Sequence, residues 1–399
     1  MSFYTVDRLG HRGDGLVQTT HGPLAIPKTL TGETVEVLDG RLHRIVTASP
    51  ERQLAFCNHF ATCGGCKFQH WQHEPYAAWK RNLLVEALSA KGLSPEIARM
   101  VDAHGAGRRR VSFHVRQQQG IWVAGFMELK SHDLCAINSC PVLVPALQQT
   151  PDMAAAFGAV LGPCDVAITA ADNGLDVNVK AERSAVLRRL GALNEIVTAH
   201  NILRLSVNGE IHTSKAAPIV KMGKAHVQLP VQSFLQATAL GEETLAALVA
   251  SHVGRAKQVA DLFCGLGPFA FRLAETSKVL AIDADKPAVA SLQLAARSSQ
   301  GLKPVTTETR DLFRVPVVPS ELKGFDAVVF DPPRAGAEDQ ARQLAKSPVK
   351  RIIAVACDVG NFSRDANILV NGGYTLKHVT PVDQFKWTAH LEMVGLFER

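Results

Sequence analysis

The alternation of strand and helix patterns after about residue 240 constrains the fold of this chain more than any other feature. A helical pattern, EETLAALVASHV (242–253), comes first, and short apolar stretches that end in polar residues follow it. These stretches are VADLFCGLGPF (259–269), VLAIDAD (279–285), FDAVVFDPPRAG (325–336) and RIIAVACD (351–358). Strands that alternate with helices predict a parallel sheet covered on both faces. The predicted fold class is therefore α/β, with a Rossmann-like domain over residues 228–399.

The first 227 residues have a different, β-rich pattern. Residues 1–50 contain short alternating segments separated by turn residues, which predict a small β-barrel of the OB-like kind. Residues 51–227 begin with clustered cysteines and a helix over 75–92, and three hairpins follow, two of them containing Asn-Gly. The hairpins span 110–127, 166–180 and 202–213. We expect three domains: 1–50, a central domain over 51–227, and 228–399.

Composition argues against several classes of protein. The hydrophobic fraction is 46% and the charged fraction 20%, as in ordinary globular proteins, and no apolar run could span a bilayer. The N-terminus lacks the layout of a signal peptide, so we expect the protein in a reducing cytoplasm. We also expect a monomer. Clustered cysteines there bind metal or perform chemistry more often than they form disulfides. The net charge of +6 permits a polyanionic partner without requiring one.

Glycines and carboxylates mark the ends of the predicted strands. The first strand runs into Gly265 and Gly267, where the backbone can turn tightly and approach a ligand. On this motif alone a plain strand–helix turn is the more frequent explanation, because the third glycine of the dinucleotide fingerprint is missing. Asp283 ends the next strand, where a carboxylate can accept both ribose hydroxyls of an adenosine.

Two further carboxylates extend this pattern. Asp311 follows the third strand and is placed to bind an adenine amine, and Asp331 follows the fourth. The carboxyl ends of parallel strands share one crevice, and a crevice lined by acids disfavours phosphates. A cationic adenosine compound without phosphates, such as S-adenosylmethionine, fits it better. Enzymes that methylate exocyclic amines often carry an aromatic residue after Asp-Pro-Pro, and Arg334 in that place indicates a different acceptor atom.

Cys357 lies just past the end of an apolar strand, at the functional rim of a parallel sheet. Carbon 5 of uracil is too weak a nucleophile to accept a methyl group unaided. A thiolate that adds to carbon 6 makes carbon 5 electron-rich, and a base must afterwards remove the proton from carbon 5. Glu392, in the segment HLEMVGLF, is a candidate for that base, although such a glutamate is more often only solvent-facing.

Taken together, the motifs resemble the RNA uracil-C5 methyltransferase family, and in particular the iron–sulfur bacterial 23S rRNA (uracil-5-)-methyltransferases. The resemblance spans the chain, is strongest from 230 to 399, and rests on DLFCGLG, FDPPRAG, the cysteine motif at 357 and PVDQF…HLEMVGLFER. It implies that Cys357 is the nucleophile and Glu392 the base. It also implies donor or base contacts at matching positions: Gln236 in SFLQ, Phe263, Asp283, Asp311 and Asp331.

The same resemblance gives a meaning to the cysteine cluster. Cys57, Cys63 and Cys66 have the spacing C-x5-C-x2-C, Cys140 matches the distant fourth ligand, and Cys135 is its rival. Four thiolates can hold a [4Fe–4S] cluster or a zinc ion. The spacing does not separate these two, whereas the family favours iron–sulfur in a structural role. The C-x3-C-x2-C spacing of radical enzymes is absent, which disfavours radical chemistry; Cys164 and Cys264 are interpreted as core.

Structured RNA is the expected partner. Residues 1–50 resemble a shortened TRAM domain, an RNA-binding barrel. Arg108, Arg109 and Arg110 match a basic stretch of the family and are candidates to clamp backbone phosphates, with a solvated charged edge as the alternative. A target uridine must leave its stack to reach a buried cysteine, which favours a loop or an unpaired site. The expected substrate is 23S rRNA, and tRNA is the alternative.

Two positions depart from the family pattern. Asp358-Val359 replace the Asn-Pro that commonly follows the nucleophile, and Pro268 stands where an Asn is often found near the donor. Neither change removes a reacting group. A cytosine-C5 enzyme is disfavoured because the fourth-strand motif, DPPR, lacks the usual Pro-Cys. A non-catalytic RNA-binding assembly factor is the remaining alternative, against which the retained Cys357 and Glu392 argue.

Overall fold

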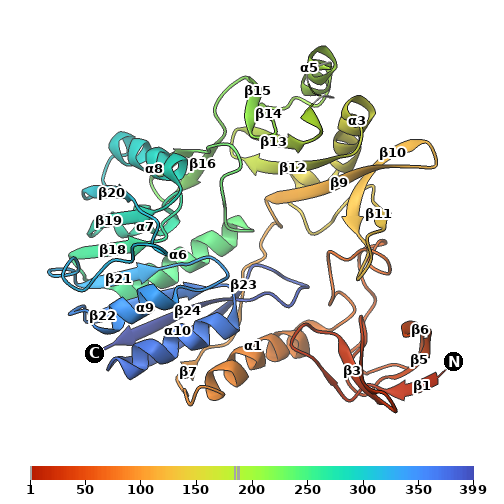
Figure 1. Cartoon of the computed structure of the whole chain (residues 1–399), viewed down its shortest axis with the longest axis horizontal. Coiled ribbons are helices and arrows are strands. Elements are labelled where there is room, and N and C mark those ends of the chain that lie inside the picture. Colours follow the sequence, from red (N-terminus) through yellow and green to blue (C-terminus); the bar gives the residue numbers. More distant parts are fainter. Residues whose placement is uncertain (1, 184–185, 187–188) are drawn as a thin grey trace. The chain divides into compact units, whose positions relative to one another are not determined.

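The chain forms two compact units (Figure 1). The computed structural model describes residues 2–183, 186 and 189–399. The first unit contains the residues up to Leu84 together with 126–135 and 385–390, and the second contains 85–125, 136–384 and 391–399. The boundaries expected at residues 50 and 227 do not coincide with this division, because the chain returns twice to the first unit.

The largest sheet in the described residues has nine strands and belongs to the second unit. Its order is β20-β19-β18-β21-β22-β24-β23-β7, with β8 also paired to β23. The strands are β18 (Gln258–Leu262), β19 (Lys278–Asp283), β20 (Val305–Thr309), β21 (Ala327–Phe330), β22 (Arg351–Ala356), β23 (Thr375–Asp383), β24 (Glu392–Glu398), β7 (Glu96–Ile97) and β8 (Val101–Asp102). Strands β18 to β22 run parallel, and β24 is antiparallel to both of its neighbours. Because β18 pairs with β19 on one side and β21 on the other, the strand order reverses there, and such a reversal opens a crevice for ligands.

Helices cover both faces of this sheet, as the strand–helix alternation predicted (Figure 1). They are α6 (Ala239–Val253), α7 (Pro268–Leu273), α8 (Lys286–Ser298), α9 (Glu338–Ala345) and α10 (Val359–Asn371). Leu245 and Val249 of α6 share one apolar core with Ile353 and Val355 of β22. On the opposite face Gly395 of β24 lets α10 approach, since a Cβ there would lie 2.7 Å from the ring of Phe362.

A second, seven-stranded sheet has the order β11-β10-β9-β12-β13-β14-β15. Its strands are β9 (Arg110–Gln118), β10 (Ile121–Met127), β11 (Leu134–Ala136), β12 (Cys164–Ala171), β13 (Gly174–Lys180), β14 (Arg204–Val207) and β15 (Glu210–Ser214), and helices α2 (Pro145–Gln148), α3 (Pro151–Leu161) and α5 (Leu190–Ala199) accompany it. All three predicted hairpins are confirmed. Asn208 and Gly209 turn with φ of 51° and 87°, the backbone that a tight hairpin favours.

The other Asn-Gly turn is shifted by one residue from its expected place. Ala171 pairs with Gly174, so Asp172 and Asn173 form the turn instead of Asn173 and Gly174. The Asn173 side chain accounts for the shift, because it donates to Ala217 O and accepts from Ile219 N. Those residues lead into the small hairpin of β16 (Ile219–Met222) and β17 (Ala225–Gln228).

The first unit contains two three-stranded sheets, β1-β5-β6 and β2-β3-β4. Their strands are β1 (Ser2–Thr5), β2 (Arg8–Leu9), β3 (Gly15–Thr19), β4 (Gly22–Ile26), β5 (Thr34–Leu38) and β6 (Arg41–Thr47). Val6, Val17, Ile26 and Val35 join both sheets in one apolar cluster. In the described residues the strands pair as two sheets instead of one closed barrel.

The chain returns to this unit late, through residues 385–390. This segment is held there by Tyr76, whose hydroxyl accepts a hydrogen bond from Trp387 N (2.9 Å), and by Lys67, whose N donates to Trp387 O (2.8 Å). Tyr76 belongs to α1 (His73–Ser89), which confirms the predicted helix there. Within the described ranges, no helix has the length and apolar character needed to cross a membrane.

Candidate active site

The carboxyl ends of the parallel strands open onto a cavity of about 490 Å³. Its walls come from the loops after five strands of the large sheet and from the segment before α6. They include every predicted donor residue and both predicted reacting residues: Gln236, Phe263, Gly265, Asp283, Asp311, Asp331, Cys357 and Glu392. Six carboxylate residues and one cation, Arg334, line the cavity. This charge pattern favours a cationic ligand over one that carries phosphates.

The loop after β18 has the tight backbone that its glycines indicated. Gly265 and Gly267 have φ of 51° and 89°, and a Cβ on Gly265 would meet open space. A Cβ on Gly267 would lie 2.7 Å from Leu292, so only glycine lets α8 pack this closely. Phe263 also has a positive φ, 61°, which for a residue with a side chain stores about 1–3 kcal/mol of strain. Its ring faces Phe313 at 5.5 Å, an aromatic partner that the sequence did not indicate.

The Asp283 carboxylate accepts hydrogen bonds from the backbone of two loops. Its Oδ2 accepts from Gly265 N and its Oδ1 from Asp285 N, both at 2.8 Å. Each carboxylate oxygen has a second lone pair for a ligand. Asp311 likewise accepts from Phe313 N at 3.0 Å and remains partly exposed at the cavity wall. Both residues therefore combine loop ordering with access to the cavity.

Asp331 and Asp261 carry strongly perturbed carboxyl groups. Burial, followed by the charge of Asp283, raises the pKa of Asp331 to about 7. Burial also raises the pKa of Asp261 far above its ordinary value, with the charges of Asp331 and Asp283 adding to the effect. Asp261 lies inside β18 and is fully buried beneath the loop. Asp261 was not predicted from the sequence, although a carboxylate in an otherwise apolar strand was a visible signal.

Gln236 connects the two sides of the cavity. Its Nε2 donates to Asp331 Oδ2 at 3.4 Å, and its Oε1 accepts from Gln384 Nε2 at 2.6 Å. Gln384 Nε2 in turn donates to Glu392 Oε1 at 3.1 Å. The predicted base and the predicted donor carboxylate are thus linked through two glutamine amides. Gln384 was not singled out from the sequence.

Arg109, in the middle of the arginine stretch, is not the exposed phosphate clamp that was expected. Arg109 is only 7% exposed and pairs with the buried Glu242 at 2.6 Å. Its Nε donates to Gln236 O at 3.0 Å, and Arg110 donates to Leu235 O at 3.1 Å. These arginines therefore hold the SFLQ segment in place, because buried backbone carbonyls require hydrogen-bond donors and a buried carboxylate requires a counter-charge.

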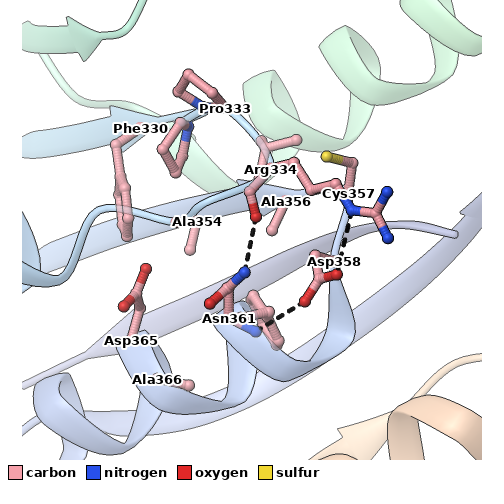
Figure 2. Close-up of a pocket in the computed structure, with 14 residues that line it drawn as sticks. Phe330, Pro333, Arg334, Ala354, Ala356, Cys357, Asp358, Asn361, Asp365 and Ala366 are labelled. Atoms are coloured by element: carbon pink, nitrogen blue, oxygen red, sulfur yellow. Dashed lines mark hydrogen bonds and ion pairs between the residues drawn. The ribbon is translucent and has the colours of Figure 1, made fainter. Parts of the chain in front are cut away.

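Cys357 follows β22 and faces the same cavity as Glu392. Burial raises the pKa of its thiol to about 12, and the charges of Glu392, Asp331 and Asp358 add to the shift, while Arg334 opposes it. Figure 2 shows the Cys357 sulfur directed away from α10, with the Arg334 guanidinium close to Asp358. The Arg334 Nε lies 3.5 Å from Asp358 Oδ2.

Asp358, one of the two departures from the family pattern, has a clear structural role. Its Oδ1 accepts from Gly360 N (3.1 Å) and Asn361 N (3.0 Å), and so caps the first turn of α10. Asn361 Nδ2 donates to Arg334 O at 2.7 Å, which ties the Asp-Pro-Pro-Arg loop to the same helix end (Figure 2). An asparagine would cap equally well, so the aspartate adds only negative charge beside the thiol.

The strands that carry this site lie in a region that matches a known family. The family model described as tRNA (uracil-5-)-methyltransferase matches residues 219–399. An uncharacterised RNA methyltransferase of Brucella suis is 44% identical over 99% of this chain and 97% of its own length. The 23S rRNA (uracil(1939)-C(5))-methyltransferase RlmD of Pseudomonas syringae is 32% identical over 99% of this chain and 93% of its own. This chain belongs to the RNA uracil-C5 methyltransferase family.

The fold of this family member agrees with a solved structure. The crystal structure of Pyrococcus abyssi tRNA (uracil-54, C5)-methyltransferase in complex with S-adenosyl-L-homocysteine superposes with a TM-score of 0.77, covering 99% of each chain at 20% identity. At this identity the likeness establishes the fold alone. It confirms the α/β part of the predicted fold class.

The cysteines of this methyltransferase lie in both compact units. Cys57, Cys63, Cys66 and the rival Cys135 belong to the first unit, and Cys140 belongs to the second. Burial raises the pKa of Cys63 to about 11, and the charges of Cys135, Cys66 and Cys57 add to it, so these four thiols interact electrostatically. In the part of the chain that the structure describes, no three His, Cys, Asp or Glu side chains are arranged to hold a metal ion. The metal site remains a prediction.

Lys28 reaches into the cysteine segment of the same unit. Its Nζ donates to the carbonyl oxygens of Ala61 (3.0 Å) and Cys63 (3.3 Å), and also to that of Phe60. Burial lowers the pKa of this ammonium, whereas the nearby thiols, Cys63 foremost, raise it. The backbone of Lys28 is strained in this position, with a φ of 61°. A cation beside four thiols is what a thiolate-bound group would need to offset its negative charge.

Proposed function

We propose that this RNA methyltransferase transfers a methyl group from S-adenosylmethionine to carbon 5 of a specific uridine in structured RNA. The observation that carries the proposal is that Cys357 and Glu392 line the same cavity as Asp283, Asp311 and Asp331. A nucleophile, a base and a carboxylate-lined crevice are the three parts that the reaction needs in one place. S-adenosylmethionine supplies an electrophilic methyl group on a positively charged sulfur.

Each protein residue then has a defined task. The Cys357 thiolate adds to carbon 6 of the uracil ring, which places negative charge at carbon 5 and on the adjacent carbonyl. After carbon 5 has been alkylated, the Glu392 carboxylate removes its proton. The electron pair of that C–H bond re-forms the double bond between carbons 5 and 6, and the Cys357 sulfur leaves. Arg334 lowers the pKa of the thiol and opposes the three carboxylates that raise it.

A mechanism-based trap tests this function. RNA with 5-fluorouridine at the target has no removable proton at carbon 5, so a covalent complex with Cys357 should persist on a denaturing gel. The complex should require the methyl donor and should be absent for Cys357→Ala. Methylation of ordinary RNA by Cys357→Ala at the wild-type rate would exclude the mechanism.

The favoured substrate class is 23S rRNA. The relative named for that substrate is 32% identical to this chain over almost its whole length, whereas the tRNA enzyme of Pyrococcus abyssi is 20% identical. A tRNA substrate is the second candidate, because the matching family model is described by tRNA. Mass spectrometry of 5-methyluridine in rRNA and tRNA from a deletion strain distinguishes them. Loss from tRNA alone would reverse the assignment.

We propose further that Cys57, Cys63, Cys66 and Cys140 hold a [4Fe–4S] cluster, with zinc as the less favoured alternative. The mutual influence of Cys57, Cys63, Cys66 and Cys135 in the first unit and the ammonium of Lys28 support a thiolate-bound group there. Cys140 is proposed as a ligand on the resemblance to the family alone. The cluster would order the cysteine segment and take no part in the methyl transfer. Iron and acid-labile sulfide analysis after anaerobic purification tests the proposal, and stoichiometric zinc without iron would replace the cluster by a zinc ion.

A further inference from the structure

Gln384 occupies an unusual position beside the proposed base. It is the residue after β23, it is fully buried, and its amide nitrogen contacts two side chains at once. Nε2 lies 2.6 Å from Gln236 Oε1 and 3.1 Å from Glu392 Oε1. An amide nitrogen carries two hydrogens, so one can serve each acceptor. The site thus commits both hydrogens of a buried amide to residues of the reaction cavity.

The direction of these hydrogen bonds is fixed by chemistry. An ionised carboxylate only accepts, so the amide nitrogen of Gln384, and not its oxygen, has to face Glu392. The second hydrogen then requires the oxygen of Gln236, which leaves the Gln236 nitrogen to donate to Asp331 Oδ2 at 3.4 Å. The side chains therefore form one continuous series of hydrogen bonds, with a carboxylate at each end, in the order Glu392–Gln384–Gln236–Asp331.

Neighbouring residues also hold this series of hydrogen-bonded side chains in place. Arg109 donates to the carbonyl of Gln236 at 3.0 Å, and its guanidinium is tied to Glu242. A Cβ on Gly241 would lie 2.7 Å from Gln384 Cβ and Oε1, so the start of α6 packs directly on this side chain. With so little room, Gln384 has few other conformations, and its hydrogen bond to Glu392 is preorganised.

We propose that Gln384 is a positioning residue that orients the Glu392 carboxylate for removal of the carbon-5 proton. This inference rests on the proposed function and assigns a further residue to it. In the step concerned, the Glu392 oxygen gains the proton, the C–H electron pair re-forms the ring double bond, and Cys357 sulfur leaves carbon 6. Gln384 does not touch the ring. It fixes the rotation of the carboxylate through one oxygen, and a carboxylate free to rotate meets the proton less often.

The expected signature is a block at one step. A Gln384→Met variant keeps the length and buried volume of the side chain but removes both hydrogen bonds. In the steps proposed above, Glu392 acts only in the elimination. We therefore expect the methylated covalent protein–RNA complex to accumulate, with elimination slowed about 10- to 100-fold.

The experiment is a single-turnover reaction with unmodified target RNA and donor carrying a labelled methyl group. Samples quenched in denaturant are separated into covalent complex and free RNA, and label in each is counted over time. Tritium released from RNA with [5-³H]uridine reports proton removal separately. For the wild type, labelled complex should be scarce; for Gln384→Met, it should rise as tritium release falls.

Gln340→Met is the matched control. Gln340 is also a buried glutamine with two hydrogen bonds, from Val317 N (2.8 Å) and to Val317 O (3.0 Å), but it lies on α9 outside the main cavity. It should leave the ratio of complex to product unchanged. Gln384→Glu is the second variant in case Gln384→Met does not fold, because a carboxylate has the shape of the amide but cannot donate to Glu392 when ionised.

The outcomes separate the two levels of the proposal. Accumulated, methyl-labelled complex in Gln384→Met, or in Gln384→Glu where Gln384→Met does not fold, supports the positioning role. Wild-type partition between complex and product in a folded Gln384 variant would overturn it while leaving the proposed function intact. Failure of the wild-type protein to form any complex with 5-fluorouridine RNA would instead reject the proposed function itself.

Discussion

The buried pair between Arg109 and Glu242 allows a quantitative prediction. Their side chains are 8% and 4% exposed, and the pair is 2.6 Å long. Replacing Arg109 by Met leaves a carboxylate in the interior without its counter-charge and removes a donor from the carbonyl of Gln236. Breaking a buried ion pair from one side costs about 3–5 kcal/mol. The loss should therefore destabilise the second unit by about 4 kcal/mol.

The assay is thermal unfolding followed by circular dichroism, with two comparison variants. At about 2–4 °C per kcal/mol, Arg109→Met should lower the melting temperature by roughly 10 °C. Arg342→Met removes an exposed pair on α9, in which Arg342 and Glu338 are 56% and 41% exposed, and should cost less than about 0.5 kcal/mol. The double variant Arg109→Met with Glu242→Leu should recover most of the stability, because no unpaired charge remains.

Two results would refute this reasoning. The first is an Arg109→Met protein whose melting temperature lies within about 2 °C of that of the Arg342→Met protein. The second is a double variant that melts below Arg109→Met, which would mean that Glu242 is stabilising without its partner.

Three further predictions concern charge and cysteine chemistry. The pKa of Asp331 is raised to about 7 in the folded state, so the stability that its neutral form contributes is fully present below about pH 4 and is lost as the pH rises towards 7. Urea unfolding at pH 5.5 and 8 should therefore show that Asp331→Asn gains stability relative to the wild type at the higher pH. An equal difference in unfolding free energy at the two pH values would contradict this prediction. Asp358→Asn keeps the helix cap but removes a charge that raises the pKa of Cys357. Alkylation of that thiol by iodoacetamide at pH 7.5 should therefore accelerate about threefold; a slower reaction would mean that Asp358 does not act through its charge. Cys140→Ser should lose its iron while Cys135→Ser, whose sulfur already contacts a threonine hydroxyl, keeps it, and the reverse result would exchange the fourth ligand.

The sequence was sufficient to predict the cavity because of a property of parallel sheets. Asp283, Asp311 and Asp331 follow three different strands, and the carboxyl ends of those strands share one edge. Once the strand–helix alternation was recognised, the convergence of these residues needed no knowledge of side-chain packing. Cys357 was placed by the same rule.

The side-chain network could not be predicted in this way. Arg109 in the sequence is one of three adjacent arginines, and its partner Glu242 lies 133 residues further along the chain. Gln384 and Gln236 are separated by 148 residues. Sequence periodicity describes which face of an element is buried, but it does not specify which distant polar group meets another inside the core. For the same reason the burial of Asp261 needed the structure.

The loop between Gln384 and Glu392 differs from most loops in how well it should tolerate inserted residues. Connections between antiparallel strands usually tolerate added residues, because their tips are free in solvent. Here residues 385–390 belong to the first unit, where Trp387 is hydrogen-bonded to Tyr76 and Lys67, and Glu392 after the loop lines the reaction cavity. An inserted residue would disturb the backbone groups of Trp387 that make these two hydrogen bonds. We therefore expect insertions in this loop to be tolerated less well than insertions in a loop whose tip is free in solvent.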